Sequence, residues 1–334
     1  MTPLDPQPQP TWTGRCQLLA LDGGGLRGMF SAAVLAGLED DLGVPIVDRV
    51  DLVAGTSTGG LIALALGAGM TARQIVDFYI SEGARIFSNP LGWRSLRHLA
   101  RPKYRPARLR DALRRQLDER TLGESTKRLV IPSYDLGRDD VYLFKTPHHP
   151  RLRRDWRVPM WEVAMATAAA PTFLPAHRLV RDRVRLIDGG IWANNPTMVG
   201  VAEAVSMLGV NIGDMRVLSL GTTTDLRHRP GRLDRGGLLR WGLSGSAVDV
   251  ILRGQSCGAY TQALHLLGSE DVVRLDPVVP PKLLRLDRVD ADDVLGWAAS
   301  ESRKLAPLVA ERFLDHRPTP YIPLMPRLEE ASHV

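Results

Sequence analysis

The sequence has little cysteine: only Cys16 and Cys257 occur among its 334 residues. They lie far apart and form no C-x-x-C pair, which excludes the short thiol motifs of redox and metal sites. The opening stretch MTPLDPQPQPTWTG also lacks a basic segment followed by an apolar one, the pattern of a secretory signal. We therefore expect a cytoplasmic protein with reduced thiols.

We expect no membrane-spanning helix at residues 52–72, although this run carries no charge and has the length of a span. The run contains GTSTGG near its start, which is typical of a strand, a tight turn and a helix. Internal repeats and low-complexity sequence are absent beyond the Pro/Gln-rich first ten residues. We predict a disordered tail over residues 1–14 and one domain over 15–330, with a helical part from 240 to 330.

Basic residues are in excess, with a formal net charge of +6 and a sequence pI near 9.6. Much of the excess lies between Arg94 and Arg115 and in RLRRDWR, Arg151 to Arg157. A positive surface permits nucleic acid or anionic lipid as a partner and does not choose between them. Solvated surface charge explains the same residues equally well, so composition alone assigns no partner.

Apolar runs alternate with helical patterns along the chain, and this alternation predicts an α/β fold. Helical segments such as FSAAVLAGLEDDLG, closed by Gly43, separate candidate strands. These strands are CQLLALD, VDLVAG, RLVIPSYDL, RLIDGGIW and RVLSLGT. The pattern indicates a mostly parallel sheet with helices on both faces. Ligands gather at the carboxyl ends of such strands, where we expect residues 22–28, 55–59 and 188–190 to meet.

The stretch DGGGLRG, residues 22–28, has glycines at the G-x-G-x-x-G spacing. Such glycines leave backbone N–H groups unpaired at the head of a helix, which suits a dinucleotide pyrophosphate or a reaction oxyanion. A dinucleotide fold requires an acidic residue at the end of the second strand, and that strand ends here in GTS. The N–H groups of Gly24, Gly25 and Thr58 are therefore candidates for an oxyanion hole.

The stretch GTSTG matches the G-x-S-x-G nucleophile motif between a strand and a helix. Gly55 and Gly59 leave room for a sharp turn that exposes Ser57, and the helix after it directs its positive end toward developing negative charge. Asp188, which ends an apolar run, is the candidate base. Histidine is the more usual base, yet no later histidine ends a strand: His228, His265, His316 or His333. A helix-capping serine and a turn-forming aspartate are the structural alternatives.

Together these motifs resemble the patatin-like phospholipase family, which orders D-G-G-G-x-[KR]-G, G-x-S-x-G and D-G-[GA] as this chain does. ATAAAPTFLPA, DGGIWANNPTMVGVAEA and VLSLGT are also similar, so the resemblance covers about Arg15 to Thr224. It implies a patatin-like three-layer fold, with Ser57 as nucleophile and Asp188 as general base of a dyad without histidine. It further implies an oxyanion site that needs no cofactor or metal and is shaped by Gly23, Gly24, Gly25 and Arg27.

The implied reaction is hydrolysis of acyl esters of membrane glycerophospholipids through an acyl-enzyme. FYISEGARIF, Phe78 to Phe87, also resembles the patatin effectors of bacterial anti-phage systems, which a cyclic nucleotide switches on to degrade the membrane. The implied partners are a phospholipid substrate, an anionic membrane surface and a nucleotide activator, with no nucleic acid. A different class stays open: a basic lipid- or nucleic-acid-binding module in which the serine is idle.

In the first half of the stretch NPLGWRSLRHLARPKYRPARLRDALRRQL, apolar and basic residues recur at helical spacing, as in an interfacial helix that brings a protein to a bilayer. They are Trp93, Leu96, Leu99 and Ala100, with Arg94, Arg97, Arg101 and Lys103. Each basic residue near an anionic surface contributes about 1 kcal/mol of binding. Replacing Arg94, Arg97 and Arg101 by glutamate should therefore abolish binding and turnover on anionic vesicles and spare a water-soluble ester. The alternative is that the apolar residues face the protein's own core and the arginines are solvated, because amphipathic helices usually pack on their own protein. If both activities fall together, or neither changes, the segment is structural.

Overall fold

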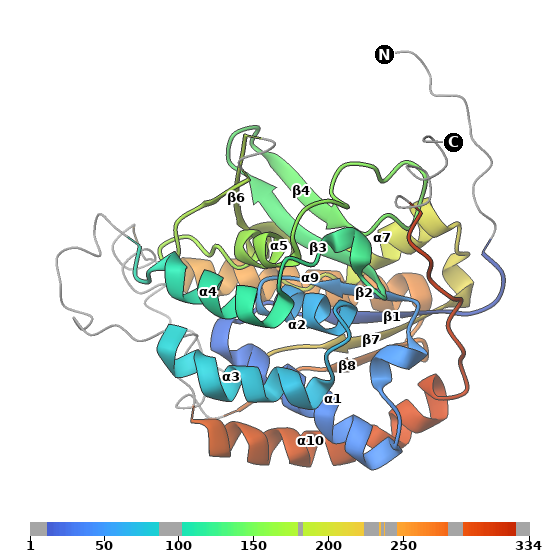
Figure 1. Ribbon diagram of the computed structural model, residues 1–334. Helices are drawn as coiled ribbons and strands as arrows, with labels where there is room; N and C mark the ends of the chain where they lie inside the picture. The colour runs from blue at the N-terminus through green and yellow to red at the C-terminus, as the bar shows by residue number, and fades with distance from the viewer. Residues whose placement is uncertain are drawn as a thin grey trace.

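The computed structural model describes residues 12–86, 102–179, 183–223, 246–279 and 290–324, together with Asp234 and Gly237. Within these ranges the chain is built around one eight-stranded sheet (Figure 1). The strand order is β5-β6-β3-β2-β1-β7-β8, and β4 pairs with β3 beside this path. Most of the predicted N-terminal tail and the first part of the predicted interfacial segment, up to Arg101, lie outside the described residues.

Five neighbouring strands of the sheet run parallel to one another. They are β1 (Cys16–Leu21), β2 (Leu52–Gly55), β3 (Arg128–Asp135), β7 (Met215–Leu220) and β8 (Val272–Leu275). β4 (Asp140–Lys145) and β6 (Val184–Asp188) pair antiparallel with β3, and β5 (His177–Leu179) pairs antiparallel with β6. The predicted parallel arrangement is thus confirmed for these five strands, whereas the strand that ends in Asp188 joins the sheet in the opposite direction.

Helices cover both faces of this sheet. One layer contains α1 (Gly28–Leu42), α2 (Thr58–Gly67), α3 (Ala72–Ile86), α4 (Pro106–Leu117), α5 (Met160–Thr167) and α10 (Ala291–Phe313). The other contains α7 (Thr197–Leu208) and α9 (Ser246–Leu267). Short helical turns are η1 (Gly25–Arg27), η2 (Ile46–Arg49), η4 (Leu122–Glu124), η5 (Ile212–Asp214) and α6 (Gly190–Ala193). The three-layer α/β fold expected from the sequence is therefore confirmed.

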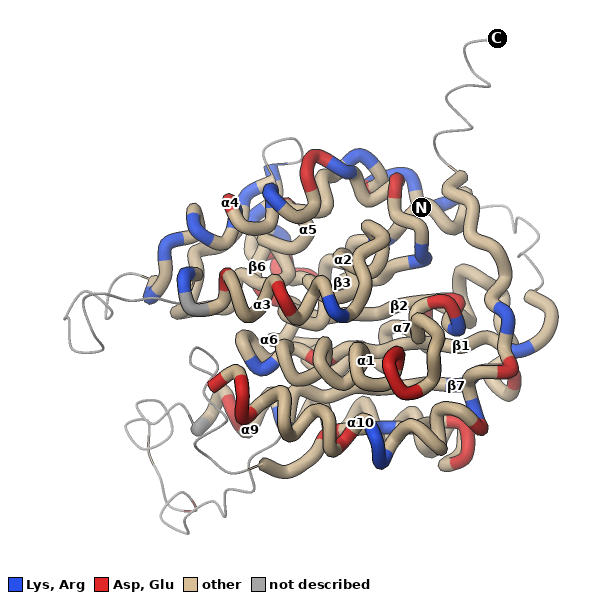
Figure 2. The backbone as a smooth tube through the Cα atoms, turned by 60° about the horizontal axis from the view of Figure 1, so that its bottom comes forward, with Lys and Arg blue, Asp and Glu red and all other residues tan. Residues whose placement is uncertain are grey.

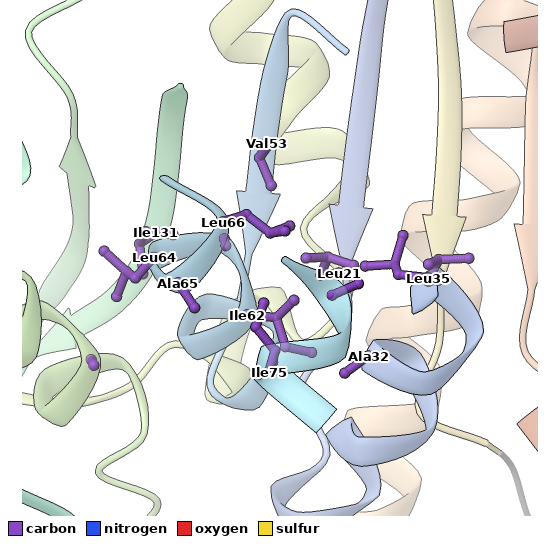
Figure 3. Close-up of a cluster of buried hydrophobic side chains, with 14 of the residues drawn as sticks. Leu21, Ala32, Leu35, Val53, Ile62, Leu64, Ala65, Leu66, Ile75 and Ile131 are labelled. Carbon is purple, nitrogen blue, oxygen red and sulfur yellow. The ribbon is translucent and has the colours of Figure 1, made fainter. Parts of the chain in front are cut away.

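The apolar core is divided in two by the sheet, because side chains of a strand point alternately to its two faces. In β1, Leu19 and Leu21 join the cluster that contains α1, α2 and α10. Cys16, Leu18 and Ala20 join the cluster on the α7 and α9 side. Figure 3 shows part of the first cluster, where side chains of α1 and α2 lie against the strands. Burial on both faces explains why these strands are continuous apolar runs.

The uncharged run at residues 52–72 forms β2 and α2, with a turn between them. Gly43 closes α1 in the left-handed conformation, with φ 69°, as its position in the sequence predicts. None of the helices in the described part of the chain has the length and apolarity of a membrane span.

A buried carboxylate ties the C-terminal segment to the amino ends of the strands. Asp51 accepts the backbone N–H groups of Gln17 and Thr319, each at 2.8 Å, and lies 2.6 Å from Nε2 of His316. Arg128 closes the same edge by donating to the carbonyl of Thr319 at 2.9 Å. The residues after α10 are thereby held at the edge opposite the carboxyl ends of β1 and β2.

We expect Asp51→Ala to lower the free energy of unfolding by about 3–5 kcal/mol, because it leaves buried N–H groups and His316 without their acceptor. Asp40→Ala is the matched control, since Asp40 is an exposed partner of Arg73 and its loss should cost at most about 0.5 kcal/mol. Urea unfolding measures both variants. Equal losses would show that the buried network contributes no special stability.

Candidate active site

Ser57 lies in a sharp turn between β2 and α2. Its backbone has φ 53° and ψ −120°, a conformation that a residue with a side chain rarely adopts. Two close approaches enforce the turn. A Cβ on Gly55 would lie 2.3 Å from the carbonyl oxygen of Gly59, and a Cβ on Gly59 would lie 2.1 Å from that of Leu21. Only glycine fits at these two positions without displacing the backbone.

The turn brings the Ser57 hydroxyl into contact with Asp188. Oγ of Ser57 donates to Oδ2 of Asp188 at 2.6 Å, and Oδ1 accepts the N–H of Gly190 at 2.7 Å. Both residues are nearly buried, with 9% and 5% of their surfaces exposed. Burial raises the pKa of Asp188 to about 6, against the opposing effect of the two hydrogen bonds. The carboxylate is therefore ionised at neutral pH and is a stronger base than an ordinary aspartate.

The position of Asp188 depends on an overhang of β3. Since β6 is antiparallel to β3, its carboxyl end faces the opposite way from the carboxyl ends of β1 and β2. Residues 128–130 of β3 pair with β2, but β3 continues past the end of β2, and its Ser133 lies opposite Asp188. β6 follows this overhang and stops beside the turn that holds Ser57. The meeting of residues 55–59 and 188–190 therefore comes from the overhang and not from neighbouring parallel strands.

The glycine loop after β1 presents its N–H groups on one side. Arg27 donates from Nε to the carbonyl of Gly24 at 3.3 Å, and the hydroxyl of Thr222 donates to the carbonyl of Gly23 at 3.0 Å. Because the carbonyl and N–H of a trans peptide point in opposite directions, these bonds turn the N–H groups of Gly24 and Gly25 the other way. Among the described residues, neither N–H group has an acceptor. Both are placed to donate to an incoming oxygen atom.

The loop passes directly beside the serine. A Cβ on Gly23 would lie 3.3 Å from Cβ of Ser57. Thr58, the first residue of α2, adds an N–H group at a helix end where the dipole favours negative charge. The Thr58 hydroxyl is hydrogen-bonded to Tyr79, and burial raises the pKa of that phenol to about 12. Tyr79 therefore stays neutral and fixes the start of the helix.

Three further residues support the site without belonging to any motif. Thr167 accepts the N–H of Ser57 at 2.9 Å and donates to the Pro132 carbonyl at 2.6 Å. The carbonyl of Asn194 accepts the N–H of Gly23 at 2.9 Å. Arg274 of β8 donates two hydrogen bonds to the carboxylate of Asp22, from Nη2 to Oδ2 at 2.6 Å and from Nη1 to Oδ1 at 3.2 Å.

Sequence reasoning missed these three supports. The first two stand inside stretches that resemble family sequence, ATAAAPTFLPA and WANNP, which was their one signal. Arg274 lies about 250 positions after its partner, and no local pattern marks it.

The described histidines take no part in the contact between Ser57 and Asp188. His148 binds Glu203 in a buried cluster, His177 lies near Glu162, and His316 is at the opposite edge of the sheet. His228 and His333 fall outside the described residues. Within the described ranges, no three or more His, Cys, Asp or Glu residues are arranged to hold a metal ion.

Comparison with known proteins assigns the family. The family model described as "Patatin-like phospholipase" matches residues 19–201, more than half of the chain. The chain belongs to the patatin-like phospholipase family. The resemblance seen in its motifs is thereby confirmed.

The alignments with relatives in this family cover most of this chain and most of each relative. A protein of Pseudomonas aeruginosa named "cGAMP-activated phospholipase" is 36% identical over 81% of this chain and 82% of the relative. One of the same name from Vibrio cholerae is 31% identical over 87% of this chain and 90% of the relative. Patatin-like protein 3 of Arabidopsis thaliana is 28% identical over 86% and 76%.

The raised pKa of Asp188 has a measurable consequence for stability. Its folded value of about 6 lies above the unfolded value of about 3.9, so the folded state binds the proton more tightly. Stability from this group is complete below about pH 4 and is lost as pH rises through about 6. Asp188→Asn removes the charge and keeps the shape. It should unfold at a higher urea concentration than the wild type at pH 8, with an advantage of up to about 3 kcal/mol.

The same comparison at pH 4 is the control, because wild-type Asp188 is then largely protonated and the advantage should vanish. An Asn variant that is less stable than the wild type at pH 8 would show that the carboxylate is not destabilised by burial.

Proposed function

We propose that this protein hydrolyses acyl esters of membrane glycerophospholipids, with Ser57 as nucleophile and Asp188 as general base. One observation carries the proposal: in a chain of a phospholipase family, the hydroxyl of a serine at a strained turn donates to a buried carboxylate at 2.6 Å. A serine hydroxyl is a poor nucleophile until a base takes its proton. The arrangement supplies that base without a histidine.

Acylation begins when Oγ of Ser57 attacks the ester carbonyl carbon and its proton passes to Asp188. The carbonyl oxygen becomes an oxyanion, and the N–H groups of Gly24, Gly25 and Thr58 are the donors that we assign to it. Collapse of this tetrahedral species breaks the ester C–O bond. The departing alkoxide of the lysolipid takes the proton from Asp188, and the acyl group stays on Ser57.

Deacylation repeats these steps with water. Asp188 takes a proton from the water molecule as its oxygen attacks the acyl carbon, and the same N–H groups stabilise the second oxyanion. When that intermediate collapses, Ser57 recovers its proton from Asp188 and the fatty acid leaves. A base with a pKa of about 6 suits this cycle, because it is ionised at neutral pH and still accepts a proton in the transition state.

The proposal includes a nucleotide activator and peripheral binding to an anionic membrane. Relatives at 36% and 31% identity are named "cGAMP-activated phospholipase", and this supports cGAMP or a similar cyclic dinucleotide as the activator. A role in anti-phage defence, in which the activated enzyme degrades the cell's own membrane, is part of the same proposal.

Membrane binding draws limited support from the described surface. Figure 2 shows Lys and Arg positions along α4. Its exposed Arg110, Arg114 and Arg115 are each paired with a carboxylate, of Asp111, Glu119 and Glu82 respectively. Paired charges attract an anionic surface less than free ones, so α4 alone is a weak docking element. We therefore propose that the main membrane contact is made by the part of the predicted interfacial segment that precedes α4.

We expect Ser57→Ala to reduce phospholipid hydrolysis by about 10⁴-fold or more, since it removes the nucleophile. Asp188→Asn should lose nearly as much, and the double variant should be no worse than either single one because the two residues act as one unit. Lipid mass spectrometry of purified protein mixed with bacterial phospholipids measures these rates. His265→Gln, a change on exposed α9, is the control and should keep most activity. Retention of more than a tenth of the wild-type rate by Ser57→Ala would overturn the assignment.

The pH–rate profile provides an independent check. Hydrolysis of a soluble short-chain ester should increase as pH rises through about 6, because only ionised Asp188 accepts the proton of Ser57. A fluorophosphonate probe, which labels activated serines, should react with the wild type and leave Ser57→Ala unlabelled. An unlabelled wild type that still binds lipid vesicles would favour the alternative, a basic binding module with an idle serine.

A further inference from the structure

A cavity lies between α9 and β8, apart from Ser57 and Asp188. Its volume is about 220 Å³, and it is lined by Arg253, Ser256, Cys257, Tyr260, Arg274 and Asp276. This is smaller than the roughly 300–1,000 Å³ of sites that bury a whole small molecule. It has room for one end of a larger ligand, such as a phosphate with part of its nucleoside.

Two arginines converge on one oxygen atom inside this cavity. Nη1 of Arg253 and Nη2 of Arg274 donate to Oδ2 of Asp276, at 2.9 and 3.1 Å. Arg274 is built into the fold, with 7% of its side chain exposed, whereas 46% of the Arg253 side chain is exposed. The guanidinium of Arg274 also lies 5.8 Å from the centre of the Tyr260 ring. A pair of guanidinium groups around one oxygen is the arrangement that binds phosphate oxygens, and Asp276 holds that place.

One side chain that lines the cavity also contacts the residue before the glycine loop. Arg274 holds the carboxylate of Asp22, the residue that precedes Gly23, so one side chain reaches both the cavity and the loop. Burial raises the pKa of Asp22 to about 6 while Arg274 opposes this shift, which makes the ion pair necessary to keep the carboxylate charged. A shift of Arg274 would therefore move the start of the loop.

Two other contacts lead from the cavity to the same loop. Asp276 lies against Gly221, where an added Cβ would be 2.4 Å from Oδ1, and the adjacent Thr222 donates to the carbonyl of Gly23. Ser256 accepts a hydrogen bond from the side chain of Asn194 at 3.0 Å, and the backbone carbonyl of Asn194 accepts the N–H of Gly23. Three independent connections thus join the cavity to the oxyanion donors.

We propose that this cavity binds one phosphodiester and part of the attached nucleoside of a cyclic dinucleotide, whose phosphate replaces Asp276 as the acceptor of Arg253 and Arg274. This inference rests on the activator named in the proposed function and gives it a site. The Tyr260 ring offers a face for the base, and Arg253 is exposed enough to follow the phosphate. When the phosphate displaces Asp276, the movement of Asp276 is transmitted to the glycine loop through Gly221 and Thr222.

Two variants of the cavity should change binding in opposite directions. Arg253→Gln removes a donor to the phosphate and should raise the Kd for cGAMP by about tenfold or more. A loss of this size is typical when a charge-assisted hydrogen bond is removed. Asp276→Asn removes the competing negative charge and should lower the Kd for cGAMP. Arg73→Gln is the matched control, since Arg73 is an exposed arginine paired with Asp40 away from the cavity. Calorimetry on the full chain measures all three.

The two cysteines supply a readout that is independent of activity. Cys257 lines the cavity and is exposed, whereas Cys16 is buried in β1, so a maleimide should modify Cys257 selectively. Saturating cGAMP should slow this modification at least about tenfold in the wild type and in Ser57→Ala. Cys257→Ala identifies the labelled site. Inorganic phosphate and a short-chain phosphatidylglycerol are the comparison ligands.

Each outcome decides a different claim. In one outcome, cGAMP stimulates hydrolysis but does not protect Cys257, and Arg253→Gln binds it as tightly as the wild type. The activator is then correct and this site is wrong. If phosphatidylglycerol protects Cys257 and cGAMP does not, the cavity is a lipid site and the inference is overturned. If cGAMP neither binds nor stimulates while Ser57-dependent hydrolysis proceeds, the activator and its site both fail and the phospholipase assignment remains.

Discussion

The geometry of the site depends on the close approach of Gly59 to the carbonyl of Leu21, where any Cβ would lie 2.1 Å from the oxygen. This contact lets the first turn of α2 lie against the end of β1. It therefore places the strained Ser57 beside the glycine loop that β1 feeds. Gly28 makes a similar contact, since its Cβ would lie 2.0 Å from the Thr58 hydroxyl, and so the starts of α1 and α2 meet at one point. The proposed nucleophile and oxyanion donors share this junction because α1 begins with a glycine, which leaves room for the Thr58 side chain at the start of α2.

Local pattern predicted the parts of this junction that local sequence determines. The strands β1 and β2, the helices after them and the glycines of both turns follow from apolar period and from steric rules that act within a few residues. The antiparallel direction of β6 does not, because an apolar run carries no sign of its direction in a sheet. Asp188 was expected at the correct edge on the assumption of parallel strands, whereas the overhang of β3 brings it there. Arg274 could not be found at all, since its partner Asp22 is joined to it only by the fold.

Destabilising features are concentrated at the carboxyl edge of the sheet. Ser57 has a strained backbone, and burial raises the pKa values of both Asp22 and Asp188 to about 6. The environments of the two carboxylates differ: Asp22 has a guanidinium partner, whereas among the described residues Asp188 has only the hydrogen bonds from Ser57 and Gly190. A paired carboxylate is a structural support, and an unpaired one stays available for a proton. The opposite edge carries the compensating network of Asp51, Arg128 and His316, which ties the end of the chain to the strands.

The contacts that join the cavity between α9 and β8 to the glycine loop indicate which part of the candidate active site a ligand there would control. The contact between Ser57 and Asp188 is held by the turn at Gly55 and Gly59 and by the overhang of β3, and none of these residues lines the cavity. The glycine loop, by contrast, is linked to the cavity through Arg274, Thr222 and Asn194. Loss of one oxyanion donor costs about 10²–10³ in kcat in a well-studied hydrolase. A ligand that favours the loop position with both N–H groups aligned would therefore control the rate over that range and leave the proposed nucleophile and base in place.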